Sequence, residues 1–381
     1  MLITLFWISL VLILYIYFGY PLTLWVLSCF THKTPRKSAL YPTVSILIPA
    51  YNEAGHIKTT IENKLRLNYP KEKLSICVIS DGSTDQTNSI VKSFQSKGVR
   101  LLTQPARQGK TAALNTGVKN TSGDIIVFSD ANSLYDKDAL LHLVKNFADP
   151  GTGYVTGKMV YINPDKSLVG DGCTAYMKYE NFLRTLETNC GSIVGVDGGI
   201  DAIRRDLYLP MQSDALPDFV LPLKVVERGF RVIYEPNAIL QEQTLSSGRD
   251  EYSMRTRVAL RAFDTLWTMR YLFNPLKYTL FSFKLLFHKF FRYTTGLILI
   301  ILFLSNLFIV LENPMFYWIF FVLQILFYIL AVTGFVTEKI KGHPSFIFPI
   351  YYFCLLHVSS TIAFFRFLKG EKKVIWEPRK G

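Results

Sequence analysis

An aspartate and an asparagine stand two residues apart where a predicted strand ends. Residues 125–128 are all apolar, which is typical of a strand buried on both faces of a parallel sheet, and Asp130 and Asn132 follow. In open α/β sheets, ligands bind just beyond the carboxyl ends of such strands. Oxygen ligands at this point suit a hard divalent cation that also takes phosphate oxygens from a bound molecule. The alternative is a turn in which both side chains bond the local backbone.

Polar side chains also follow two earlier predicted strands. The first strand reaches Pro49 and is followed by Tyr51 and Glu53, and the second, over 74–80, is followed by Asp81. The carboxyl ends of parallel strands meet at one edge of the sheet, so the three polar clusters are expected to form the rim of one pocket.

Strands alternate with helices over residues 43–248, which predicts an α/β domain with a mostly parallel sheet. The glycine-rich segment 195–201 is predicted to be a loop. Strands are predicted over 44–49, 74–80, 99–102, 125–128, 153–161 and 231–234, and helices over 53–67, 84–91, 109–118, 171–186 and 219–228.

The segment Gly109, Lys110, Thr111 imitates part of an ATPase phosphate-binding loop. That loop needs a glycine five residues before its last glycine, where this chain has Gln104. The nucleotide-hydrolase interpretation is therefore disfavoured, and no Gly-x-Gly-x-x-Gly follows a strand to support a dinucleotide oxidoreductase. Lys110 remains a candidate cation for a diphosphate, and its alternative is a solvated lysine on a helix face.

The two ends of the chain are apolar enough to cross a membrane. Hydrophobic residues make up 50% of the chain, and residues 1–30 carry no charged side chain, which predicts a membrane anchor. Basic residues follow at 32–37 and place the next segment in the cytoplasm. About three further spans are predicted within 293–368, before a basic tail over 369–381.

The net charge of +13 has two interpretations, nucleic acid or membrane. Over 271–291 the cations alternate with aromatic residues, which favours amphipathic helices within 249–292 that lie on an anionic membrane surface. The alternative is a surface helix of the soluble domain. No nucleic-acid partner is expected. Three spans after a cytoplasmic domain put the basic tail outside, against the positive-inside rule. We favour four spans in total, and the alternatives are that one segment does not cross or that the interfacial stretch does.

These clusters resemble glycosyltransferase family 2, specifically the membrane-bound branch that includes cellulose, hyaluronan and poly-N-acetylglucosamine synthases. The resemblance covers about residues 43–265 and implies a nucleotide-sugar-binding domain of the GT-A type. It rests on the motifs at 49–53 (Pro-Ala-Tyr-Asn-Glu), 81–85 (Asp-Gly-Ser-Thr-Asp), 109–115 (Gly-Lys-Thr-Ala-Ala-Leu-Asn), 129–132 (Ser-Asp-Ala-Asn), 198–205 and 218–222.

The resemblance also implies roles for individual residues. Asp218 is the implied catalytic base, Gly198 and Gly199 lie on the acceptor side, and Asp130 with Asn132 binds Mg²⁺ or Mn²⁺. A helix cap is the alternative for Asp218. The implied donor-binding residues are Pro49, Tyr51, Glu53, Asp81, Lys110, Asp130 and Arg257.

The chain departs from the family pattern at three points. Asn132 replaces the second aspartate of the metal motif, and Pro217 precedes the base where an acidic residue is common. The Gln-x-x-Arg-Trp motif of processive synthases is missing, and Arg257 is its nearest counterpart. Arg257 and Arg261 face either the diphosphate or lipid head groups.

The expected protein is thus an inverting, metal-dependent glycosyltransferase of the inner or plasma membrane with a cytoplasmic catalytic domain. Its expected partners are a nucleotide-sugar donor of the UDP-linked class, a glycan or lipid-linked acceptor, the bilayer, and export or assembly proteins. The alternatives are a processive polysaccharide synthase that extrudes its product and a non-catalytic scaffold that keeps the sugar-nucleotide fold.

Overall fold

One eight-stranded sheet forms the centre of the α/β domain, in the order β3-β2-β1-β4-β7-β6-β8-β5. Four of its seven pairings are parallel, and β7 runs antiparallel to both of its neighbours. The predicted α/β class with a mostly parallel sheet is therefore confirmed. The strands are β1 (Val44–Ala50), β2 (Leu74–Ser80), β3 (Val99–Thr103), β4 (Ile125–Phe128), β5 (Leu134–Tyr135), β6 (Thr152–Ile162), β7 (Asp201–Arg204) and β8 (Arg231–Gln243).

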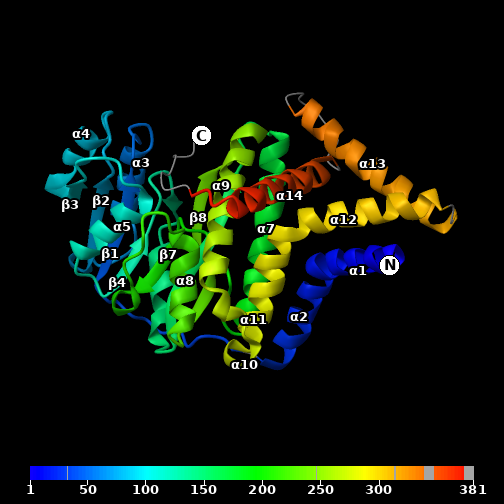
Figure 1. Cartoon of the computed structure of the whole chain (residues 1–381). Helices are drawn as coiled ribbons and strands as arrows, with labels where there is room; N and C mark the ends of the chain where they lie inside the picture. Colours follow the sequence, from blue (N-terminus) through cyan, green and yellow to red (C-terminus); the bar gives the residue numbers. More distant parts are fainter. Residues whose placement is uncertain (32, 246, 313–314, 339–346, 373–381) are drawn as a thin grey trace.

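The computed structural model describes residues 1–31, 33–245, 247–312, 315–338 and 347–372, so the predicted tail lies outside it from residue 373 onward. Helices cover both faces of the sheet, and a bundle of apolar helices projects from the side opposite β1 to β3 (Figure 1). The domain helices are α3 (Ile57–Leu65), α4 (Thr87–Lys92), α5 (Lys110–Lys119), α6 (Ala139–Val144), α7 (Leu168–Asn189) and α8 (Pro217–Glu227).

Alternating side chains of β1 explain why the sheet needs helices on both faces. Val44, Ile46 and Ile48 join one hydrophobic core, whereas Leu47 joins the core on the opposite face. All of β1 is buried. A strand of this kind is stable only between two layers, and the layers hold its carboxyl end in a fixed position.

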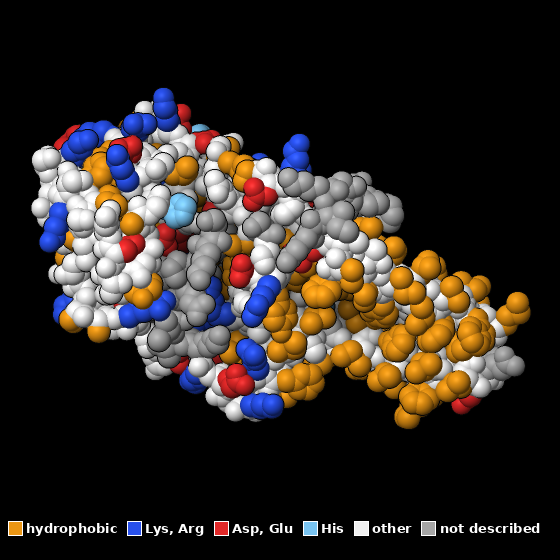
Figure 2. Space-filling view, turned by 90° about the horizontal axis from the view of Figure 1, so that it is seen from above, with side chains coloured by type: hydrophobic (Ala, Val, Ile, Leu, Met, Phe, Trp, Pro, Cys, Tyr) orange, Lys and Arg blue, Asp and Glu red, His pale blue; other side chains and the backbone are white. Residues whose placement is uncertain are grey.

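Four helical segments are long and apolar enough to cross a membrane, within the part of the chain that the structure describes. Apolar side chains gather over these projecting helices, and charged side chains lie mainly over the α/β domain (Figure 2). The segments are Leu2–Thr31 (α1, Leu2–Leu14, and α2, Tyr20–Thr31), Leu280–Leu311 (α11, Leu280–Lys284, and α12, Phe291–Leu311), α13 (Met315–Thr337) and α14 (Ile347–Leu368).

Several polar side chains at the end of the predicted interfacial stretch point into the protein. The Lys284 ammonium donates to the carbonyl oxygen of Glu187 at 2.8 Å, and the His288 ring lies between the carboxylates of Glu180 and Glu187. Arg292 pairs with Glu180. These three side chains therefore fasten the helix that contains α12 to α7, and the interpretation that placed Lys284 and Arg292 on the membrane surface is corrected.

The helix before them is also covered. α9 (Gly248–Thr268) packs Leu260 and Phe263 against Ala363 of α14. A short helix α10 (Pro275–Tyr278) then leads into α11. The α/β domain and the apolar helices consequently share a continuous packed contact, in which α9 lies between the domain and the bundle (Figure 1).

Candidate active site

The carboxyl ends of β1, β2 and β4 lie side by side. Ala50 pairs with Ser80, and Leu47 pairs with Phe128, so the polar segments after the three strands leave the sheet at the same edge. The convergence predicted for parallel strands is thus confirmed. α5 begins at this edge and places Lys110 in its first turn.

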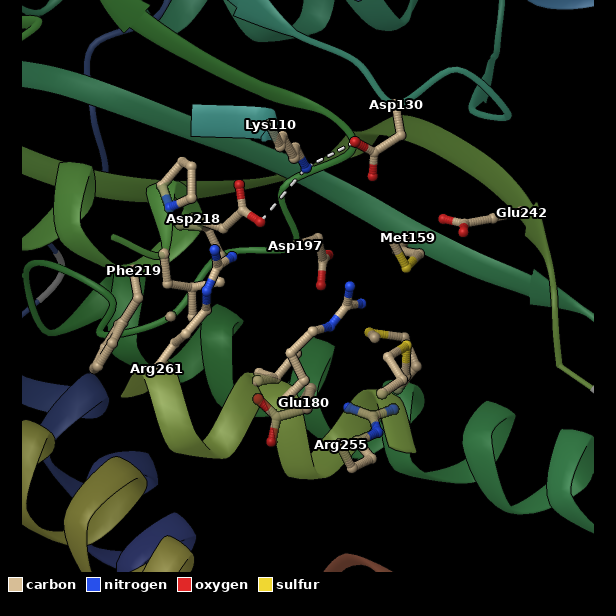
Figure 3. Close-up of a pocket in the computed structure, with 18 of the residues that line it drawn as sticks. Lys110, Asp130, Met159, Glu180, Asp197, Asp218, Phe219, Glu242, Arg255 and Arg261 are labelled. Atoms are coloured by element: carbon tan, nitrogen blue, oxygen red, sulfur yellow. Dashed lines mark ion pairs between the residues drawn. The ribbon is translucent and has the colours of Figure 1, made fainter. Parts of the chain in front are cut away.

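The ammonium of Lys110 lies between two carboxylates. Its Nζ is 2.7 Å from Asp130 Oδ1 and 3.7 Å from Asp218 Oδ2 (Figure 3). Burial acts to lower the pKa of Lys110, but Asp130 and then Asp218 outweigh it and hold the pKa above its usual range. The residue is only 9% exposed, so it is not the solvated helix lysine considered as an alternative.

Asp218 comes from the first turn of α8, and its carboxylate turns toward Lys110. The N-cap residue of α8 is Leu216, so the interpretation of Asp218 as a helix cap is wrong. Burial raises the pKa of Asp218, Lys110 opposes this rise, and Asp130 adds to it. A carboxylate with a raised pKa beside a buried cation is suited to accept a proton.

Gly198 makes room for that carboxylate. Its φ is +83°, and a Cβ at this position would overlap the carboxyl group of Asp218. The Gly198 N–H donates to Asp201 Oδ2 at 2.9 Å, and the Tyr154 hydroxyl donates to the same oxygen at 3.0 Å. Asp201 at the start of β7 therefore fixes the turn behind the candidate base, and Gly199 follows in the same turn.

Replacing Asp201 with asparagine is expected to remove one cause of the fall in folding stability with rising pH. Burial, and next the Asp218 carboxylate, raises the pKa of Asp201 to about 7. The unfolded chain loses this proton near pH ~4. The folded state therefore binds more protons between these values, and stability falls as the pH rises through that window. From this group we expect the unfolding free energy to fall by ~2 kcal/mol between about pH 5 and about pH 8.

Denaturant unfolding of the purified protein in detergent micelles, at both pH values, measures this effect. The Asp201→Asn variant should show a flatter pH dependence, because its amide oxygen can still accept both hydrogen bonds but has no charge to bury. An unchanged pH dependence would contradict the assignment.

Six of the predicted site residues line one cavity of about 230 Å³: Glu53, Lys110, Asp130, Asn132, Asp218 and Arg257. Its far wall carries Glu242 from β8, and the Asn132 amide donates to Glu242 Oε1 at 3.2 Å. Burial, followed by the charge of Asp130, raises the pKa of Glu53 to about 7. The sheet edge is thus acidic on one side of Lys110 and cationic toward α9.

The donor set fits a divalent cation that completes its coordination with a bound molecule. Carboxylate and amide oxygens of Asp130 and Asn132 face the same cavity and are the ligand types that Mg²⁺ and Mn²⁺ prefer. The described residues contain no preassembled group of three or more His, Cys, Asp or Glu side chains for a metal. Phosphate oxygens and water would therefore supply the other ligands.

Three predicted donor residues lie outside the cavity lining. Pro49 is buried within β1 opposite Ile79. The guanidinium of Arg107 lies 3.8 Å from the centre of the Tyr51 ring. Asp81 accepts the backbone N–H groups of residues 108 and 109 at 2.7 and 2.8 Å, so it holds the loop that delivers Lys110.

Sequence patterns did not point to a buried ion pair at the floor of the cavity. Arg184 Nη1 lies 2.6 Å from Asp197 Oδ2, and both side chains are almost fully buried. Glu180 lies one turn before Arg184 on α7 (Figure 3 labels Glu180 and Asp197). Charges at positions 180, 184 and 187 share one helix face, which is the signal that could have identified a buried polar face.

Comparison with known proteins agrees with this geometry. Residues 45–209 match the family model described as "Glycosyl transferase family 2". The chain is 33% identical over 233 residues to "Probable glycosyltransferase YdaM" of Bacillus subtilis (strain 168), covering 57% of this chain and 54% of that protein. It is 29% identical over 202 residues to "Poly-beta-1,6-N-acetyl-D-glucosamine synthase" of Staphylococcus aureus (strain MSSA476), covering 51% and 48%. The chain therefore spans about half the length of these curated relatives.

The fold has a solved counterpart over almost its whole length. The mannosyltransferase PcManGT from Pyrobaculum calidifontis, in complex with GDP-Man and Mn²⁺, superimposes with a TM-score of 0.73 at 22% identity, covering 96% of this chain and 99% of that one. The α/β domain is thus a GT-A-like domain flanked by apolar helices. Residues 45–209 therefore match glycosyltransferase family 2, as the motifs predicted.

Proposed function

We propose that this protein is a membrane-bound, inverting glycosyltransferase that moves a sugar from a nucleoside-diphosphate donor, with UDP-sugars as the favoured class. Its acceptor is a glycan or a lipid-linked glycan. The observation that carries the proposal is the placement of Lys110 between Asp130 and Asp218 in one cavity. A single-displacement reaction needs a cation and a metal-binding carboxylate on the leaving-group side of the sugar and a base on the acceptor side, and these residues provide both.

The donor diphosphate would lie along the edge formed by Asp130 and Lys110. A divalent cation bound there neutralises the charge that develops on the leaving diphosphate. Lys110 adds a second positive charge at the same place, and Arg261 from α9 faces the cavity from the opposite wall. Both cations are held by the fold before the reaction, so they need little reorganisation as the charge develops.

The nucleoside would lie over the adjoining strand ends. Tyr51, stacked against Arg107, offers an aromatic surface beside the loop that Asp81 anchors. This loop leads directly into Lys110, so base and diphosphate would be held by one continuous segment. Pro49 shapes the strand end without lining the cavity.

Asp218 would take the proton from the attacking hydroxyl group. A sugar hydroxyl is a poor nucleophile, so a positioned carboxylate must accept its proton as the new bond forms. Asp218 lies across Lys110 from Asp130, so attack and departure occur on opposite sides of the sugar, and the anomeric configuration inverts. Gly198 and Gly199 hold the acceptor-side turn behind it.

Asp130→Ala is expected to lower nucleoside diphosphate release by about 10²-fold or more, because the diphosphate loses its metal anchor. Calorimetry of UDP binding provides a readout apart from activity. Mn²⁺ should tighten UDP binding to the wild type and should have little effect on UDP binding to Asp130→Ala. The Asn132→Ala variant loses only a neutral ligand, so Mn²⁺ should still tighten its UDP binding in part. If Mn²⁺ tightened UDP binding equally in all three proteins, the metal assignment would be wrong.

Two other functions give different results in simple assays. A processive synthase gives a product ladder of high mass on a gel, and the poly-N-acetylglucosamine synthase among the relatives keeps this alternative open. A non-catalytic scaffold binds UDP without turnover on any acceptor. The basic segment after the first span favours a cytoplasmic catalytic domain in the cell membrane, where export or assembly proteins can receive the product.

A further inference from the structure

A second cavity, of about 350 Å³, lies between the catalytic domain and the membrane-spanning helices. Its walls come from the segment between α1 and α2, from α7 and α9, from the residues around the start of α12, and from α14 as far as Ser360. Five of its lining residues also line the active-site cavity: Tyr176, Arg255, Val258, Lys289 and Tyr293. The two cavities are therefore neighbours that share one wall.

Three cations face this second cavity. The Arg255 guanidinium pairs with Glu251 and donates to the Tyr352 hydroxyl, and Arg292 pairs with Glu180. Lys289 differs, because its ammonium makes no hydrogen bond or ion pair with any of the described residues. The cluster therefore contains one ammonium without a direct ion pair among the described residues, on which Glu180 and Glu187 act only at longer range, and this favours an anionic ligand.

Lys289 also lines the active-site cavity that contains the candidate base Asp218. A Cβ at Gly195 would overlap the Lys289 ammonium, which lies 6.0 Å from the centre of the Phe219 ring. Phe219 directly follows Asp218 on α8. A ligand anion bound by Lys289 would therefore lie close to the place where the acceptor hydroxyl must be held.

The cavity reaches the lipid-facing surface on one side and ends within the bundle on the other. Phe18 lines it and is 72% exposed among apolar helices. Farther along, Phe6 of α1 packs tightly against Leu302 and Ile309 of α12. No lining residue of α12 lies beyond Tyr293, within the described chain. This shape suits a lipid head group at the membrane interface with its chain leaving sideways, and it does not suit a passage across the membrane.

We propose that this cavity binds the phosphate or diphosphate of a long-chain lipid that carries the acceptor glycan, with Lys289 as its main cationic contact. The inference rests on the proposed glycosyltransferase function and specifies its acceptor as an anionic lipid conjugate. The lipid phosphate lies in the second cavity, and the attached sugar extends past the shared wall to Asp218. Arg255 and Arg292 add positive charge around the phosphate.

Binding tests the proposal without any acceptor turnover. The full-length protein in detergent micelles, saturated with UDP and Mn²⁺ to fill the donor site, is titrated with farnesyl diphosphate, farnesol and inorganic diphosphate. We expect farnesyl diphosphate to bind most tightly, because only this probe has both the charge and the apolar chain. Lys289→Gln should weaken it about tenfold, since one charged hydrogen bond is lost. Lys277→Gln, an exposed lysine ahead of the same helix, should leave binding unchanged.

Acceptor assays then connect the site to the reaction. A monosaccharide linked to farnesyl diphosphate should have a lower KM than the same sugar on an uncharged alkyl chain, and Lys289→Gln should abolish that difference. The proposal is overturned if farnesol binds as well as farnesyl diphosphate, if Lys289→Gln binds like the wild type, or if both acceptors have the same KM. Failure of the proposed function itself would look different, because no donor would then release nucleoside diphosphate with any acceptor.

Discussion

The Asp218→Asn variant is expected to transfer sugar about 10³-fold more slowly than the wild type. General-base catalysis is worth about 10²–10⁴-fold, and the upper part of that range is expected because a buried site offers no ready substitute for the base. The amide keeps the shape of the side chain and its place beside Lys110, but it cannot take a proton. Release of nucleoside diphosphate with saturating donor and acceptor measures the loss.

A matched control distinguishes loss of the base from loss of the fold. Asp214 lies in the same loop before α8 and pairs with Lys372 at 3.2 Å on the surface, so Asp214→Asn should keep near-normal turnover. Both variants should bind UDP as the wild type does. Because the pKa of Asp218 is raised, wild-type turnover should decline as the pH falls through a value above the usual aspartate range. An Asp218→Asn enzyme with wild-type turnover would remove Asp218 from the mechanism.

Gly198→Ala is expected to reduce activity by at least about 10²-fold, because misplacement of a reacting group by about 1 Å has an effect of this size. The added methyl group occupies the space of the Asp218 carboxyl, so the carboxylate must move away from Lys110. Donor binding along Asp130 should change much less, since the new methyl group lies on the acceptor side. The expected signature is a large fall in kcat with a nearly unchanged donor KM.

Gly229→Ala is the matched control for this prediction. Gly229 has a φ of +84°, almost that of Gly198, but a Cβ there meets no other atom within 4 Å. Both variants should lose about 1 kcal/mol of stability from the left-handed backbone, and only Gly198→Ala should lose activity. If the two variants lost the same activity, backbone strain and not the overlap with Asp218 would be the cause.

The sequence predicted the donor side of the sheet well because its signals are local. The apolar runs of β1, β2 and β4 end at polar residues, and the register of these strands brings Glu53 and Asp130 to one edge. α5 follows the predicted helix over 109–118 almost residue for residue. In such segments, burial and turn chemistry are properties of neighbouring residues in the chain.

The acceptor side was harder to predict because its partners are distant in sequence. β7 was not predicted: the loop predicted over 195–201 ends at its first residue, Asp201, and its four residues pair with β4 and β6. β8 continues past Pro236, where a register shift against β6 accommodates the proline. Patterns within one segment do not specify pairings of this kind.

The cations before α12 provide the clearest example. Lysine and arginine among aromatic residues are typical of a membrane surface, yet Lys284 and Arg292 find their partners on α7, more than ninety residues earlier in the chain. Composition identifies such residues as interfacial, whereas the fold decides which way they point. The position of Lys289 between the two cavities could not be predicted from the sequence for the same reason.

The most direct test of the central claim is nucleoside diphosphate release by the purified, full-length protein across a panel of UDP- and GDP-sugars, with Mn²⁺ and membrane lipid extract. The account predicts release from a UDP-sugar that rises when the lipid extract is added, requires Mn²⁺, and falls by about 10³-fold in Asp218→Asn. UDP binding without release from any donor in the panel would contradict it and would favour a non-catalytic scaffold.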